Sequence, residues 1–348
     1  MDQALAGMPW TCELEAHPRP IIPVGDAAAV TDYLRKKMSG KSTRNYWNRL
    51  KKPGNVRLEQ IREPDQLTRI FDQLIVYYDI RQGGIHGKFE FEGDLAKKPF
   101  HLALLRTPGL LHITILKAGE EIISAWFGVT HRKTYSGAMP MFSPFYASDS
   151  PMTVHLLMLV EQLHQDGFSV LDLTPGPDAF KDRFAADYDS AHALSIYFRQ
   201  RIKYKVMRGS ETLAKRTLRS LRITPGSALE QWRQLARVPL RTWPSVLARE
   251  LPALLRGPRS TTEWRIYVIE PKNVAALEHP GRMSRDRLAD LLAFQPSEFW
   301  RTRQKFTAES LKRIENGHHF YTGVEYGRLV HCSWLAENKK MDVFPGTR

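Results

Sequence analysis

The sequence of residues 133–184 is KTYSGAMPMFSPFYASDSPMTVHLLMLVEQLHQDGFSVLDLTPGPDAFKDRF, and its pattern decides the fold. Lys133–Met139 predicts a strand, and residues 142–149 follow as a loop. Ser150-Pro151 then opens a helix, because serine is a preferred N-cap and proline suits the first helical turn. Apolar residues recur at helical spacing until Gly167, and residues 168–173 predict a short buried strand.

The start of this helix is a candidate anion site. A helix that begins after a strand and a loop presents unpaired backbone N–H groups and the positive end of its dipole. Such a terminus suits a phosphate or a pyrophosphate. The residues that we expect to bind this group are Ser150, Pro151, Met152, Thr153 and Val154.

The elements around this stretch complete an α/β (α+β) pattern. Residues 56–61 predict a strand, 65–78 and 99–105 predict helices, and 111–116 with 122–129 predict a hairpin. Residues 191–198 predict the last strand. This order favours a mixed, mostly antiparallel central sheet flanked by helices. Residues 82–88 contain three glycines and predict a flexible loop.

Several spaced residues resemble the CelD/BcsL-type (FemAB-like) acyltransferases of the GNAT superfamily. The resemblance covers roughly residues 40–205 and includes a basic helix at 42–50 that precedes the first strand. Two positions depart from the family: Met152 stands where glycine is usual, and Phe180 where tyrosine is usual. The residues that carry the resemblance are Tyr146, Ser150-Pro151, Gly167, Asp172, Gly176 and Phe180-Lys181.

The resemblance implies a GNAT-like fold and acyl transfer from acetyl-CoA or another acyl-CoA to an amine. The acceptor it implies is an amino sugar or another polysaccharide or envelope precursor. Met139 and Met141 lie on the strand expected to polarise the thioester through a backbone N–H. Asp172 is expected to orient substrate or act as a base, with a structural cap as the alternative. Lys181 is expected to pair with a phosphate or an acidic substrate, with a surface ion pair as the alternative.

Other chemistries lack their motifs. The sequence has no G-x-S-x-G elbow, P-loop, G-x-G-x-x-G fingerprint or H-E-x-x-H motif. Its two cysteines are far apart and have no metal-ligand spacing, so no metal and no disulfide framework is expected. His155 and His164 are predicted to lie on the surface of their helix. The composition is that of a globular protein, and the cytoplasm is the expected compartment.

The second half repeats part of the first. Gly119 precedes Trp126 by seven positions in a predicted hairpin, and Gly327 precedes Trp334 in the same way. Predicted helices at 284–292 and 307–314 and a strand at 264–269 precede this second hairpin. We therefore predict a connector over 1–40, a GNAT-like domain over 41–205, a helical basic linker over 206–261 and a partial second GNAT-like unit over 262–348.

The net charge of +14 is concentrated in residues 201–259, which hold 14 Lys and Arg residues against 3 acidic ones. Three interpretations stay open: a linker helix packed on both domains, attachment to an anionic membrane surface, and contact with nucleic acid. No specific nucleic-acid motif is present. The alternative to an enzyme is a non-catalytic, degenerate GNAT scaffold that binds a protein partner or the inner face of a membrane through this stretch.

Overall fold

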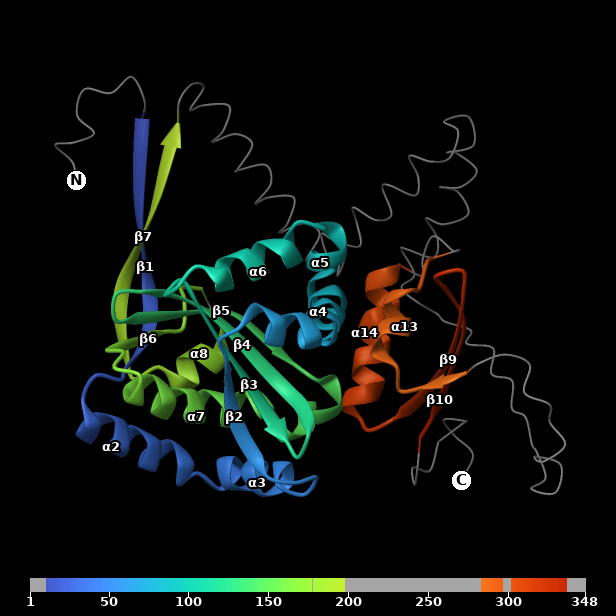
Figure 1. Ribbon diagram of the computed structural model, residues 1–348, viewed down its shortest axis with the longest axis horizontal. Coiled ribbons are helices and arrows are strands. Elements are labelled where there is room, and N and C mark those ends of the chain that lie inside the picture. The colour runs from blue at the N-terminus through green and yellow to red at the C-terminus, as the bar shows by residue number, and fades with distance from the viewer. Residues whose placement is uncertain (1–10, 177, 198–282, 297–301, 337–348) are drawn as a thin grey trace, which may run out of the picture. The chain divides into compact units, whose positions relative to one another are not determined.

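The computed structural model describes residues 11–176, 178–197, 283–296 and 302–336 (Figure 1). The chain divides into two compact units. The first unit contains residues 1–78 and 90–217, and the second contains residues 79–89 and 218–348. Helix α4 (Pro64–His86) contributes residues to both. The predicted strand at 264–269 and the basic stretch 201–259 lie outside the described residues.

The first unit is built on a seven-stranded sheet with the order β2-β3-β4-β5-β6-β1-β7. All neighbouring strands are antiparallel except β5 and β6, which confirms the mixed, mostly antiparallel sheet expected from the sequence. The strands are β1 (Thr11–Pro23), β2 (Val56–Ile61), β3 (Leu111–Ala118), β4 (Glu121–His131), β5 (Thr134–Phe142), β6 (Val170–Asp172) and β7 (Asp187–Tyr197).

Helices cover both faces of this sheet (Figure 1). On one face Phe127 of β4 meets Phe71 of α4 and His101 of α6 (Lys97–Arg106), with α5 (Glu90–Gly93) beside them. On the other face Trp126 and Tyr135 join a core with α2 (Ala27–Met38), α7 (Pro151–Gln165) and α8 (Ala179–Phe184). Helix α3 (Lys41–Leu50) packs beside α7 and beside η1 (Pro144–Asp149).

Residues 11–38, expected to be part of a connector, instead form β1 and α2. Strand β1 pairs with β6 over 21–23 and with β7 over 11–21. The Pro20 carbonyl accepts the Leu173 N–H, so this side of Pro20 faces β6. Pro18 faces the same side, where β6 has already ended, and its missing N–H therefore costs no ladder hydrogen bond. The prolines remove the sequence signal for a strand, but β1 still forms.

Residues 82–86 continue helix α4, although the sequence predicted a flexible loop there. The two glycines serve close packing in this helix. A Cβ on Gly83 would lie 2.3 Å from the Phe89 ring, and one on Gly84 would lie 3.4 Å from Ala308. Glycine at these positions lets helix α4 approach its neighbours within the second unit.

The described part of the second unit has a three-stranded sheet of order β10-β9-β8. Its elements are β8 (Ser284–Arg285), α13 (Leu288–Leu292), α14 (Arg303–Glu315), β9 (His319–Glu325) and β10 (Arg328–Leu335). The helix expected over 284–292 is shorter, because Ser284 and Arg285 pair with β9. Gly119 and Gly327 both adopt positive φ in a hairpin turn, at 61° and 73°. The two hairpins therefore share their turn chemistry.

Candidate active site

Strands β5 and β6 run side by side for three residues and then separate. Thr134–Ser136 pair in parallel with Val170–Asp172. β6 ends there, whereas β5 continues to Phe142. In the described part of the chain, no strand pairs with this edge of β5 beyond Ser136. The sheet is therefore open beside residues 137–142.

The sequence of β5 fits an open edge. Proline has no N–H and is confined to strand edges, and Pro140 lies in this segment, exposed. Ala138 is the extra residue of a β-bulge, because Phe127 pairs with Met139 and Gly128 pairs with Gly137. Of the two methionines expected at the cofactor, Met139 is half-buried and Met141 is fully buried. Met141 therefore offers only backbone groups to a ligand.

A glycine pair holds β5 against β4 at the point of separation. Gly128 and Gly137 lie opposite each other. A Cβ on Gly137 would lie 2.8 Å from the Trp126 indole nitrogen, and one on Gly128 would lie 2.1 Å from the Tyr135 ring. Both aromatic side chains are buried with α7. Their rings occupy the space that side chains at these two positions would need.

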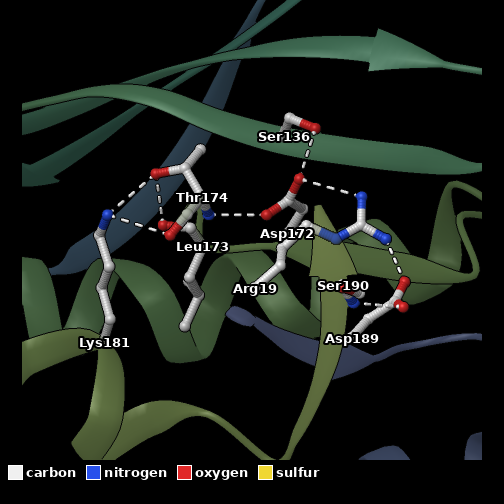
Figure 2. Close-up of polar contacts among 8 residues, drawn as sticks. All are labelled: Arg19, Ser136, Asp172, Leu173, Thr174, Lys181, Asp189 and Ser190. Atoms are coloured by element: carbon white, nitrogen blue, oxygen red, sulfur yellow. Dashed lines mark hydrogen bonds and ion pairs between the residues drawn. The ribbon is translucent and has the colours of Figure 1, made fainter. Parts of the chain in front are cut away.

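Asp172 lies at the last paired residue of β6 and collects hydrogen bonds there (Figure 2). Its Oδ2 accepts the Ser136 hydroxyl at 3.1 Å, and its Oδ1 accepts the Thr174 N–H at 2.6 Å. The residue is only 6% exposed. A buried carboxylate with these donors is suited to holding a neighbouring group in place, since both oxygens already accept hydrogen bonds.

Arg19 of β1 brings a positive charge to this carboxylate (Figure 2). Its Nη1 lies 3.6 Å from Asp172 Oδ2, and its Nη2 forms an ion pair with Asp189 of β7. The pKa of Asp189 is lowered, because the Ser190 N–H and the Arg19 guanidinium stabilise its charged form. Four strands, β5, β6, β1 and β7, therefore contribute one residue each to a polar cluster. Its members are Ser136, Asp172, Arg19 and Asp189.

Lys181 reaches the same region through the loop after β6. Its Nζ donates to the Thr174 carbonyl at 3.1 Å and to the Thr174 hydroxyl at 3.0 Å. Thr174 has a positive φ of 66°, which is unusual for a β-branched residue. The amine therefore stabilises a strained turn, and Thr174 links the two residues that were predicted to be catalytic, Asp172 and Lys181 (Figure 2).

The start of α7 differs in detail from the expected N-cap. Ser150 adopts the left-handed region with φ 45°, and its side chain makes no capping hydrogen bond. Its carbonyl instead accepts the Thr153 N–H at 2.9 Å. Pro151, Met152, Thr153 and Val154 are all buried. A phosphate at this terminus would therefore meet backbone groups and not these four side chains.

Helix α3 anchors the loop that precedes α7. Arg49 Nε lies 2.6 Å from Asp149 Oδ1, and Arg49 Nη2 donates to the Ser148 carbonyl at 2.8 Å. Tyr146 in the same loop donates to Glu121 at 2.6 Å. These three contacts hold the segment between the open strand β5 and the start of α7.

The prediction that His155 lies on the surface is wrong, because its face of α7 packs on the sheet. His155 is fully buried, and its two ring nitrogens lie 2.8 Å from the hydroxyls of Thr114 and Ser124. Burial lowers its pKa to about 3. His164 is half-buried, and its Nδ1 lies 2.8 Å from the Val24 carbonyl. Neither residue belongs to the polar cluster.

Within the described ranges, no group of three or more His, Cys, Asp or Glu residues could hold a metal ion. In the same part of the chain, no helix combines the length and the apolar composition needed to cross a bilayer.

Residues 37–182 match the family model described as "Acetyltransferase (GNAT) domain". Residues 37–182 therefore match a GNAT acetyltransferase domain, the GNAT-like fold expected from the sequence is confirmed, and the match supports an acyltransferase. GNAT domains use acyl-CoA as the acyl donor. No protein among those with curated functions matches the chain significantly.

Solved structures that are similar to this chain share little sequence identity with it. The C-terminal DUF2156 domain of a protein from Agrobacterium fabrum is 13% identical with a TM-score of 0.38, and the match covers 62% of this chain and 68% of that one. L-PGS from Bacillus licheniformis is 15% identical with a TM-score of 0.38, covering 59% and 68%. FemX is 10% identical with a TM-score of 0.39, covering 54% and 63%. These similarities are too distant to transfer a substrate to this chain.

The sequence pattern predicted Asp172 and Lys181 as site residues and gave no signal for the neighbouring residues Ser136, Arg19 and Asp189. Ser136 lay within a predicted strand, where a single serine carries no signal. Arg19 stands between two prolines in a segment with no predicted element. Only the pairing of β1 with β6 and β7 brings it to Asp172, more than 150 residues away in the sequence.

Proposed function

We propose that this protein transfers an acyl group from acyl-CoA to an amine at the open edge of β5. One observation carries the proposal: the separation of the parallel strands β5 and β6 beside a buried, hydrogen-bonded carboxylate. An open strand edge offers backbone N–H groups to the thioester carbonyl, whose oxygen gains negative charge during attack. Pro140 has no N–H, and N–H groups alternate between the two edges of a strand, so those of Met139 and Met141 face β4 and Ala138 is the candidate donor among residues 138–141.

The chemical step needs a neutral amine. Its nitrogen attacks the thioester carbon, the carbon–sulfur bond breaks, the CoA thiolate leaves, and the amine loses a proton to water or to a base. We assign Asp172 to orienting the acceptor through Ser136, because both of its carboxylate oxygens already accept hydrogen bonds. Lys181 supports the same site by holding the Thr174 loop.

We also propose that the CoA pyrophosphate binds at residues 150–154, at the start of α7. The support is the strand–loop–helix order and the dipole of a helix of 15 residues. The finer assignment is to the CelD/BcsL type, with an amino sugar or another envelope or polysaccharide precursor as acceptor. It rests on the resemblance of residues 40–205.

The test is calorimetry followed by an activity assay. Acetyl-CoA, longer acyl-CoAs and free CoA are titrated into the protein, and release of the CoA thiol is then measured with glucosamine, spermidine and lysine as acceptors. We expect acetyl-CoA or a longer acyl-CoA to bind and at least one amine to raise thiol release above the rate in water. If neither acyl-CoA nor CoA binds, the proposal is wrong.

A non-catalytic scaffold is the second candidate, and two residues favour it. Met152 is 8% exposed and packs in the core, and the Phe180 ring packs 4.8 Å from the Phe184 ring. The glycine and the phenol usual at these positions are therefore replaced by apolar packing. Binding of acyl-CoA without turnover of any amine would support this candidate.

We further propose that residues 201–259 attach the protein to anionic lipid, and that residues 262–348 form a partial second GNAT-like unit. The support for the first is composition alone: basic residues beside Trp and Leu at helical spacing. Flotation with vesicles of phosphatidylglycerol and of phosphatidylcholine tests it. We expect recovery with the anionic vesicles only, lost at high salt. Equal recovery with both, or with neither, contradicts it.

A further inference from the structure

Arg19 stands at a junction of three strands. Ile21, two residues further along β1, pairs with Asp172 of β6, and Arg19 itself pairs with Asp189 of β7. Side chains two residues apart lie on the same face of a strand. Arg19, Asp172 and Asp189 therefore lie on one face of the sheet, and Figure 2 shows the guanidinium between the two carboxylates.

Asp172 needs a compensating charge. Its side chain is only 8% exposed, and burying a carboxylate is unfavourable unless a cation or several donors stabilise it. Ser136 and the Thr174 N–H are neutral donors. Lys181 directs its amine to the Thr174 oxygens. The positive charge at Asp172 is that of Arg19, at 3.6 Å.

Asp189 holds the arginine in turn. Its carboxylate pairs with Arg19 Nη2 and accepts the Ser190 N–H at 2.6 Å. Because the guanidinium is planar, fixing one of its nitrogens restricts where the others point. Nη1 is thereby directed toward Asp172.

The GNAT match begins at residue 37 and ends at residue 182. Ser136 and Asp172 lie inside it, whereas Arg19 and Asp189 lie outside. We propose that Arg19 is a positioning residue for acyl transfer: held by Asp189, it keeps the Asp172 carboxylate directed at Ser136, where β5 and β6 separate. The N-terminal strand is then a required part of the site. This inference rests on the proposed function.

The test compares R19Q, R19K and D189N with the matched control R57Q. Arg57 is also a strand arginine with two carboxylate partners, Glu59 at 2.7 Å and Glu120 at 3.0 Å. The Arg57 side chain is 33% exposed and the Arg19 side chain 27%. Arg57 lies on β2, at the opposite end of the sheet. A general loss of stability should therefore affect R57Q and R19Q alike.

Three quantities are measured: the Kd of acetyl-CoA by calorimetry, kcat and KM with the best amine of the panel, and amide exchange at Thr174. We expect R19Q to lower kcat by about tenfold or more and to leave the acetyl-CoA Kd within about twofold. R19K, which keeps the charge, should recover most of kcat, and D189N should lie between. Exchange of the Thr174 amide should accelerate in R19Q and stay unchanged in R57Q, because its acceptor is Asp172.

A wild-type kcat in R19Q would overturn the inference, and so would equal losses of kcat in R19Q and R57Q. Failure of the proposed function gives a different result: the unmodified protein would bind no acyl-CoA. Thr174 exchange then still decides whether Arg19 holds Asp172, and an unchanged rate in R19Q would count against it.

Discussion

The Ser136 hydroxyl donates a hydrogen bond of 3.1 Å to the Asp172 carboxylate at the last paired position of β5 and β6. Beyond this contact one strand continues and the other ends. The paired part of β5 and β6 thus ends with a side-chain hydrogen bond, and the edge of β5 after Ser136 has no paired strand in the described part of the chain. This geometry places oriented polar groups directly beside an unpaired strand edge.

Replacing Asp172 by asparagine should separate catalysis from folding. D172N keeps the shape but removes the charge beside Arg19. We expect acetyl-CoA binding within about twofold of wild type, and a kcat lower by about 10- to 100-fold. The free energy of unfolding should fall by about 1–3 kcal/mol, because the partners of the carboxylate lose a charged acceptor. S136A is the companion variant, and an unchanged kcat in both would show that the cluster is structural.

Replacing Lys181 by methionine tests whether its amine stabilises the Thr174 turn or contacts a phosphate. If its amine only holds the Thr174 turn, K181M should lower stability by about 1–2 kcal/mol and leave acetyl-CoA affinity unchanged. If the amine contacts a phosphate, the affinity should fall by about tenfold and become less salt-dependent. The structure leads us to expect the first result. Calorimetry at two salt concentrations, with urea unfolding, measures both quantities.

The glycine pair should tolerate no side chain. G128A places a methyl group 2.1 Å from the Tyr135 ring, and G137A places one 2.8 Å from the Trp126 nitrogen. Overpacking of a buried site costs about 1–3 kcal/mol, and we expect G128A to be the more destabilising of the two. G93A is the control, because nothing lies within 4 Å of its added methyl group. Urea unfolding of the three variants gives the order, and a neutral G128A would contradict the packing described above.

Much of the fold could be predicted because its signals are local. The hairpin of β3 and β4, helix α7 and the succession of strands and helices along the chain around them follow from apolar periodicity and turn residues within short windows. Strand β1 could not be predicted in this way. Pro18 is acceptable in it because β6 has ended beside that residue, and that fact depends on residues far away in the sequence.

The candidate site combines residues that the sequence signals with residues that it does not. Asp172 and Lys181 lie in the stretch that decides the fold, so their positions after a buried strand gave a signal. Their partners gave none: Arg19 reaches Asp172 only through the sheet. Ser150 is the N-cap of α7 as predicted, but its backbone is left-handed and its carbonyl, not its hydroxyl, accepts the Thr153 N–H.

The buried imidazole of His155 should make the stability of the protein depend on pH. Its pKa in the folded state is about 3, because burial disfavours the charged ring, whereas in the unfolded chain it is close to 6.5. Between these values the unfolded state binds a proton that the folded state does not. The contribution of His155 is therefore complete above pH 6.5, and it is lost as the pH falls toward 3, with a slope of up to about 1.4 kcal/mol per pH unit.

Urea unfolding between pH 5 and pH 7 measures this slope with little interference from carboxylates. His112 titrates in the same direction, because burial also lowers its pKa although Asp166 partly opposes the shift. The comparison is therefore between wild type, H155Q and H112Q. H155Q should be less stable at pH 7, since Thr114 and Ser124 lose their partner, and its stability should vary less between pH 5 and pH 7. If H155Q keeps the full wild-type slope, the imidazole is accessible to protons and the described burial of α7 on the sheet is wrong.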